Sequence, residues 1–147
     1  MDDDLVTAVN RLVTVGMGTH RVIGELLGMH PTDLAAVGHL SAEGAMTQEQ
    51  LRRRLRLGKG SMTALVKRLV AAGRIERRQH PSDGRAVLLA ATPATVAARR
   101  AARRRMDEAI AAAAARLGPA ERASVAAFLA DAAEAQGRAL ADLLDRD

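Results

Sequence analysis

The sequence contains no cysteine, no tryptophan and no tyrosine, and Phe128 is its single phenylalanine. Without thiols, the chain cannot form disulfides, thiolate metal sites, a cysteine nucleophile or a cysteine-based peroxide sensor. With one aromatic ring, a pocket that holds a flat ligand between aromatic side chains is hard to build. These absences exclude thiol chemistry and disfavour an aromatic-lined ligand site.

Apolar runs long enough to cross a membrane are missing too. A bilayer-spanning helix needs roughly 20 consecutive apolar residues, no stretch approaches that length, and residues 2–4 are acidic. The length of 147 residues is typical of one domain, which would bury about two thirds of its unfolded surface. We expect one soluble, cytoplasmic domain over residues 1–147, with no membrane partner.

Groupings of residues that could run a reaction are missing as well. The acidic residues are scattered, with no serine, histidine and acid grouping and no glycine-rich phosphate loop. The spacing of His20, His30 and His39 fits no common metal site, which favours packing or helix-capping roles. The sequence therefore predicts no enzyme, no metal and no cofactor.

Positive charge, by contrast, is concentrated in the middle of the chain. The net charge is +5, but residues 51–90 hold eleven basic and two acidic residues, a net charge of +9. Such a density favours a polyanionic partner over the alternative, an ordinary solvated surface. A second run of arginines, over residues 99–105, is expected to be the solvated side of an interface helix. The basic residues of the middle are Arg52, Arg53, Arg54, Arg56, Lys59, Lys67, Arg68, Arg74, Arg77, Arg78 and Arg85.

The spacing of apolar residues predicts two N-terminal helices. Apolar side chains recur every three or four positions over residues 5–26, and Gly28 ends that helix. Gly16 and Gly18 each cost up to about 1 kcal/mol relative to alanine, so a bend or unwound turn is expected there. A second helix starts at Pro31, which has no N–H to leave unpaired.

Two shorter helices are predicted next. Thr47 and Gln50 fit a capping box, which starts a helix through Leu55. A glycine turn over residues 58–60 leads into a helix over residues 61–72. One face of this second helix is apolar with a period of 3.6 residues, and the opposite face is small, polar or basic. That opposite face could approach a phosphate backbone closely.

After Gly73 the pattern changes to two strands around a turn at residues 80–84, which predicts a basic hairpin. Thr92 and Pro93 then start an alanine-rich helix that reaches Leu117, and a Gly-Pro break begins a last helix. The expected fold is mainly α with a small β-hairpin wing, in the order α-α-α-α-β-β-α-α.

A helix, a tight turn, a second helix and a basic hairpin within about 45 residues form a winged helix-turn-helix arrangement. The major groove of duplex DNA admits one α-helix, so the helix from residue 61 can present side chains to base edges. Arg85 near the hairpin tip could enter the minor groove, with Asp83 holding the tip in shape. We expect DNA contacts from Ser61, Thr63, Ala64, Lys67 and Arg68 on the helix, from Arg77, Arg78, Asp83 and Arg85 on the wing, and from Arg52, Arg53 and Lys59 to the DNA backbone.

Several stretches, in this order and spacing, carry a family likeness. They are His30–Leu34, Met46-Thr47 with Gln50-Leu51, Ser61-Met62-Thr63 with Leu65-Val66 and Leu69, Gly73–Arg77, and Asp83-Gly84-Arg85. Together they resemble the MarR-type (multiple antibiotic resistance) transcription regulators along most of the chain. In that family a small packed residue usually stands where this chain has Arg52, so its guanidinium is expected to extend toward solvent.

The resemblance implies a homodimer that binds an inverted-repeat operator, often as a repressor released by a small, frequently phenolic ligand. Residues 1–45 and 93–147 would support and join the two copies, and residues 46–92 would bind duplex DNA. The apolar stripes of the terminal helices also favour a second copy, and two-fold symmetry then predicts a pseudo-palindromic site. Two alternatives stay open: a sequence-neutral DNA-compacting protein, and a protein-binding module that keeps the fold without binding DNA.

Overall fold

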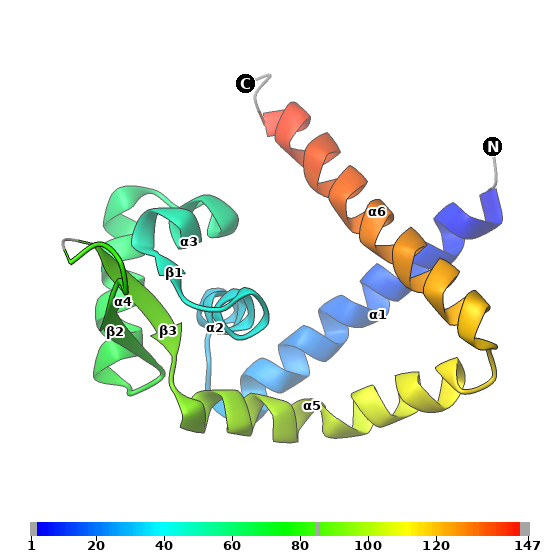
Figure 1. The fold of residues 1–147 in the computed structure, drawn as a ribbon, viewed down its shortest axis with the longest axis horizontal. Helices are drawn as coiled ribbons and strands as arrows, with labels where there is room; N and C mark the ends of the chain where they lie inside the picture. The colour runs from blue at the N-terminus through cyan, green and yellow to red at the C-terminus, as the bar shows by residue number, and fades with distance from the viewer. Residues whose placement is uncertain (1–2, 85, 145–147) are drawn as a thin grey trace. The chain divides into compact units, whose positions relative to one another are not determined.

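The computed structural model describes residues 3–84 and 86–144, and the chain divides into two compact units, Met1–Arg104 and Arg105–Asp147. The fold is mainly α with a small sheet, as the sequence predicts (Figure 1). None of the helices in the described ranges is long and apolar enough to cross a bilayer. The elements are α1 (Asp3–Leu27), α2 (Pro31–Glu43), β1 (Met46–Thr47), α3 (Gln48–Leu55), α4 (Lys59–Ala71), β2 (Ile75–Gln79), β3 (Val87–Ala91), α5 (Pro93–Ala114) and α6 (Pro119–Leu144).

Helix α1 is continuous, so the expectation of an unwound turn at Gly16 and Gly18 is wrong, and the alternative of a bend there stays a prediction. Glycine lowers helix propensity but keeps its N–H and C=O, and the hydrogen-bond ladder can therefore pass through both positions. The helix ends where the sequence predicts, because Gly28 adopts φ of 60°, a left-handed conformation that glycine reaches at little cost.

Helix α2 forms the middle of the first unit. It packs on α1 at one side and on α3 and β3 at the other (Figure 1). Its buried face carries Leu34, Val37 and Leu40, and these side chains meet the buried faces of the neighbouring elements. The single apolar stripe predicted for this helix is therefore confirmed as the centre of the core.

The sheet has three strands in the order β1-β3-β2, whereas the sequence predicted two. The third strand is short: Met46 pairs with Leu89 and Thr47 with Leu88. Two residues are too few to show the alternation of apolar and polar side chains that marks a strand. The predicted hairpin itself is confirmed, with Ile75 opposite Ala91 and Gln79 opposite Val87.

Helix α4 begins at Lys59, two residues earlier than the sequence predicted. Gly58 is its N-cap, with φ of −66° and ψ of 158°, and the N–H of Met62 already donates to the Gly58 carbonyl at 2.9 Å. The tight turn therefore lies before the glycines, at Arg56, which takes φ of 52°. The expected turn at residues 58–60 is wrong because Gly60 is tolerated in the first turn of a helix.

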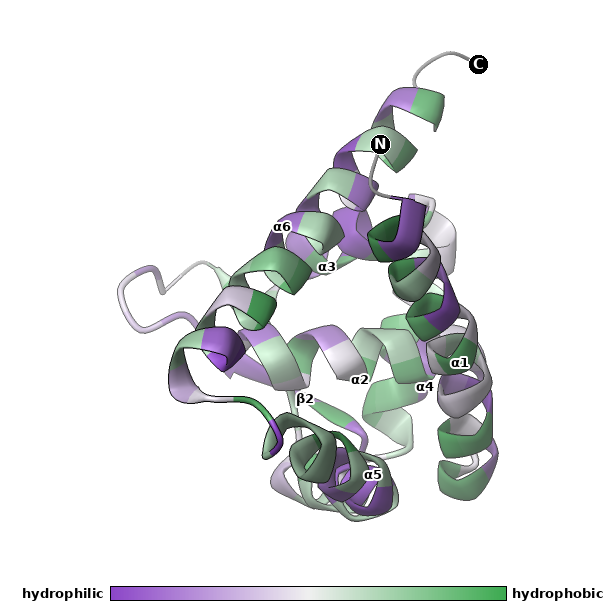
Figure 2. Ribbon diagram, turned by 90° about the vertical axis from the view of Figure 1, so that its right-hand side faces the viewer, coloured by the Kyte–Doolittle hydropathy of each residue, from purple (hydrophilic) through white to green (hydrophobic). Residues whose placement is uncertain are grey.

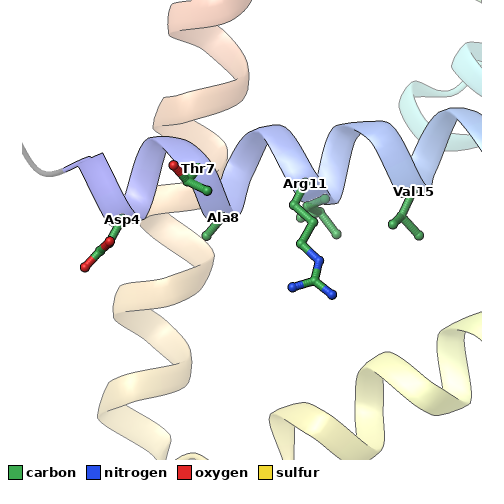
Figure 3. A pocket seen from close by; sticks show the side chains of 6 residues that line it. Asp4, Thr7, Ala8, Arg11 and Val15 are labelled. Carbon is green, nitrogen blue, oxygen red and sulfur yellow. The ribbon is translucent and has the colours of Figure 1, made fainter.

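Helices α1, α5 and α6 keep many apolar side chains exposed within the described chain. On α1 only Ile23 and Gly24 are buried, and Figure 2 shows hydrophobic residues along much of its length. Figure 3 shows Asp4, Ala8 and Arg11 projecting from the same side of α1 into a surface hollow of about 480 Å³. Exposed apolar residues include Leu5, Leu12, Val15 and Met17 on α1, and Ile110, Val125, Phe128, Leu129, Leu140 and Leu143 in the second unit.

The end of α5 also differs from the prediction, which extended this helix to Leu117. The helix ends at Ala114. The N–H groups of Arg116 and Leu117 donate to the carbonyls three residues back, at 3.2 and 3.1 Å, which is the tighter geometry of a last helical turn. Thr92 starts the helix as predicted, since its Oγ1 accepts from the N–H of Thr95 at 3.3 Å.

Candidate nucleic-acid interface

Helix α4 has two contrasting faces. Met62, Leu65 and Leu69 are at most 2% exposed and hold the helix against the core, as their 3.6-residue spacing predicts. The predicted base-reading residues occupy the other face: Ser61, Thr63, Ala64 and Lys67 are all exposed. Because one face is fixed by packing, the other is presented to solvent in a defined orientation.

The groove between α3 and α4 lies beside this exposed face. Gln48, Glu49, Arg52, Lys59 and Thr63 line a hollow of about 310 Å³ there. The Thr63 hydroxyl donates to the Lys59 carbonyl at 3.0 Å, which fixes its proton and leaves its lone pairs available to a donor such as a base amino group.

Arg52 stands where the family resemblance implies a small packed residue. Its side chain is half-buried: Nη1 donates to the Leu57 carbonyl at 2.9 Å, and Nε and Nη2 donate to Glu49 at 2.7 and 2.8 Å. The arginine therefore ties the body of α3 to the turn that follows it. This contact explains how a long cationic side chain replaces a small packed one.

Glu49 also accepts from Arg53 at 2.9 Å. The hydrogen bonds from Arg52 and then from Arg53 lower the pKa of Glu49 to about 2, and the same contact raises the pKa of Arg52. Both arginines that were expected at the DNA backbone, Arg52 and Arg53, thus share one carboxylate. Their charge is partly neutralised before any DNA arrives.

The same happens to Arg54, whose guanidinium meets Glu43 of α2 with Nη2 and Oε2 2.6 Å apart. Hydrogen bonds from Arg54 and then from His39 lower the pKa of Glu43. His39 therefore has a partner four residues along its own helix, at 2.8 Å. This contact is consistent with the local role that the sequence predicts for that histidine.

Arg68 lies on α4 and pairs with Asp33 of α2. Nε donates to Oδ2 at 3.0 Å and Nη2 donates to Oδ1 at 2.5 Å, and the contact raises the pKa of Arg68. Asp33 is 6% exposed, so its carboxylate lies inside the core. The sequence offered no signal for this partner, which is 35 residues away.

On the wing, Arg77 and Arg78 are both exposed, but only Arg78 has an acidic partner among the ion pairs seen, Glu76 at 2.5 Å. Arg85, the predicted minor-groove residue, lies outside the described residues.

The tip of the wing is organised by a residue that the sequence reasoning passed over. His80 Nδ1 accepts from the N–H groups of Ser82 and Asp83 at 3.3 and 3.2 Å. The carbonyl of Asp83 accepts from the N–H of Ala86 at 3.0 Å. Asp83 therefore takes part in the turn through its main chain, and the imidazole next to Pro81 could have been noted as a local cap.

Four exposed cations near α4 and the wing have no ionic partner among residues 3–84 and 86–144; Arg74 has none there either, but it is partly buried and donates to the Leu27 carbonyl at 2.9 Å. The four are Arg56, Lys59, Lys67 and Arg77. Arg56 was counted in the basic segment but given no role, and its left-handed turn beside the N-terminus of α4 places it near Lys59. This set, with the exposed face of α4, can meet a phosphate backbone and present polar groups to base edges.

Comparisons with known proteins identify relatives among transcription regulators. Residues 27–86 match the sequence model described as MarR family. The chain is 38% identical over 86 residues to YcgE, an uncharacterized HTH-type transcriptional regulator of Bacillus subtilis (strain 168), covering 56% of each chain. The chain thus spans about half the length of the curated relatives it matches.

Solved structures support the fold along most of the chain. RV1404 from Mycobacterium tuberculosis is 27% identical, with a TM-score of 0.63, over 92% of this chain and 91% of that one. NadR in complex with 4-hydroxyphenylacetate is 22% identical, with a TM-score of 0.62, over 90% of this chain and 91% of that one.

Proposed function

We propose that the protein is a homodimeric transcription regulator of the MarR family, whose sequence model matches residues 27–86. It binds a pseudo-palindromic duplex operator, with α4 in the major groove, and acts as a repressor. Residues 46–92 bind the DNA, and residues 1–45 and 93–147 support and join the two copies.

The observation that carries this proposal is the exposed face of α4. It combines small and polar groups, Ser61, Thr63 and Ala64, with two lysines, Lys59 and Lys67, that have no ionic partner in the described part of the chain. Small side chains let a helix sit deep in a groove about 12 Å wide, and hydroxyl and ammonium groups can bond base edges and phosphates. Arg77 on the wing and Arg56 at the turn before α4 are exposed cations as well.

The dimer is supported by the apolar residues that the chain leaves exposed. Leu12, Val15 and Met17 on α1 are 53, 60 and 71% exposed, and burying a leucine contributes about 1.5–3 kcal/mol. A second copy offers an equivalent surface, and a two-fold axis brings like faces together. Sedimentation should give a dimer at micromolar concentration, and Leu12→Glu should give a monomer, whereas Ala45→Glu in an exposed loop should not.

A small-molecule effector is a separate part of the proposal, supported by the likeness in fold to NadR, whose structure holds 4-hydroxyphenylacetate. Phenolic acids added to a complex of the protein with its DNA should then lower the affinity. Unchanged affinity across such a series would remove this part and leave the DNA-binding proposal standing.

Selection of bound fragments from genomic DNA, followed by footprinting, tests the proposal directly. A specific regulator should prefer its operator over random DNA by at least about a thousandfold. Equal affinity for all duplexes would instead support a DNA-compacting protein. No affinity for any duplex would support a protein-binding module.

A further inference from the structure

The ion pair between Asp33 and Arg68 differs from the others around α4. The side chain of Asp33 is 8% exposed, whereas Glu43 and Glu49, which pair with arginines of α3, expose 39 and 47%. A buried carboxylate with its partner removed loses the group that replaces its hydration, while an exposed one regains water. Of these contacts, the one with Arg68 is therefore the one whose loss should cost most.

This pair also joins α2 and α4, which otherwise make few direct contacts with each other. Asp33 lies in the first turn of α2, and α2 packs mainly on α1, α3 and β3. Arg68 lies in the last turn of α4 and faces Asp33 with two parallel bonds, at 3.0 and 2.5 Å. A two-pronged contact between a planar guanidinium and a carboxylate fixes orientation as well as distance.

We propose that Arg68 is a positioning residue and not a DNA contact: its fork on Asp33 sets the placement of α4 against α2, and thereby determines how well the protein distinguishes its operator from other DNA. This inference rests on the proposed function. It replaces the sequence-based expectation that Arg68 binds DNA. Small shifts of α4 would move Ser61, Thr63 and Lys67 relative to base edges, where hydrogen bonds demand close geometry.

A phosphate contact is the competing role, because the side chain of Arg68 is 53% exposed. The two roles respond differently to conservative changes. A lysine at position 68 keeps the charge for a phosphate but loses the planar fork. An asparagine at position 33 removes the negative charge of the carboxylate that accepts from Arg68. The positive charge of Arg68 is then not offset by this residue.

The experiment measures affinity for the selected operator and for random DNA over a range of salt concentrations. Arg68→Lys and Asp33→Asn should each lower the preference for the operator by about tenfold, with the salt dependence unchanged because no phosphate contact is lost. The double variant should be no worse than either single variant. Arg138→Lys and Glu134→Gln, at the exposed pair on α6, are matched controls that should keep the wild-type preference.

Two results would overturn the inference. One is a wild-type preference in Arg68→Lys. The other is tighter binding of random DNA by Asp33→Asn with a steeper salt dependence, since a freed Arg68 would then be reaching phosphates. If Asp33→Asn does not fold, Arg68→Lys still tests the inference. The Arg68 side chain is 53% exposed, so a lysine at this position should be compatible with folding.

Amide hydrogen exchange without DNA separates this inference from the proposed function. Faster exchange along α4 in Arg68→Lys, relative to Arg138→Lys, supports the positioning role whether or not the wild-type protein selects DNA. Unchanged exchange along α4 contradicts it. A wild-type protein that selects no DNA overturns the proposed function, and the exchange result then decides the placement of α4 by itself.

Discussion

The region from Met46 to Thr92 and the N-terminal part of α1 expose different kinds of side chain: mainly polar and basic ones in the first, and several apolar ones in the second. In the first, Leu51, Leu65 and Leu89 are at most 2% exposed, and most of the exposed side chains are polar or basic. In α1, Leu12 is more than half exposed. The comparison teaches that one chain can present two surfaces of different chemistry, a basic one on its middle segment and an apolar one on its first helix.

A second contrast lies within the basic region itself. Some arginines, such as Arg53 and Arg68, already have carboxylate partners, while Lys59 and Lys67 have none among the described residues. Surface ion pairs add little stability, but they do reduce the charge that a site presents to DNA. The number of basic residues therefore overstates the charge available to a phosphate backbone.

The largest expected effect tests buried against exposed leucines. Leu65→Ala should lower the free energy of unfolding by about 2–5 kcal/mol, because it leaves a cavity beneath α4. Leu12→Ala should cost about 0.5 kcal/mol or less in the isolated chain. Urea unfolding at low and high protein concentration measures both. The loss of unfolding free energy caused by Leu12→Ala should grow with protein concentration. The same loss at low and high concentration would show that Leu12 is not covered by a second copy.

The next effect tests unpaired against paired cations. Lys67→Ala should weaken binding of the selected operator by about 1–3 kcal/mol. Arg53→Ala, at a side chain already paired with Glu49, should cost less than about 1 kcal/mol. Fluorescence anisotropy with labelled duplex gives both values, with Arg122→Ala on α6 as the control. A larger loss from Arg53→Ala would show that ion pairs do not decide which cations meet DNA.

A smaller effect is expected where α3 begins. Thr47 and Gln50 form the predicted capping box: Thr47 Oγ1 accepts from the N–H of Gln50 at 3.2 Å, and Gln50 Oε1 accepts from the N–H of Thr47 at 2.8 Å. Thr47→Ala should reduce stability by about 0.5–2 kcal/mol. Thermal unfolding measures this, and Thr47→Ser, which keeps the hydroxyl, should behave like the wild type. A Thr47→Ala variant as stable as Thr47→Ser would show that the box is dispensable.

The smallest effect concerns pH. The pKa of Glu49 is about 2 in the folded protein and ordinarily 4.5, so its ionised form is favoured by folding. The stabilisation is fully present above the ordinary pKa and is lost as the pH falls toward 2. Glu49→Gln should therefore lose less stability than the wild type between pH 5 and pH 2 in urea unfolding. Equal losses in both proteins would show that the pairs with Arg52 and Arg53 add nothing to folding.

Much of the fold could be predicted because its signals are local. Gly28 and Gly73 take positive φ of 60° and 64° at the ends of α1 and α4, and glycine is the residue that reaches this conformation most easily. Strand β1 could not be predicted, because two residues pair only when β3 lies beside them. The start of α4 was misplaced because a glycine pair is compatible with a turn or with a first helical turn.

The sequence by itself determined which residues form each face of α4, because helical periodicity is a property of the chain. It also determined that residues 51–90 are basic. Only the tertiary structure decided that Arg54 and Arg68 are paired, because Glu43 and Asp33 lie 11 and 35 residues away from them in the sequence. Ionic contacts depend on distances of a few ångströms, and folding sets those distances between residues that sequence spacing leaves unrelated.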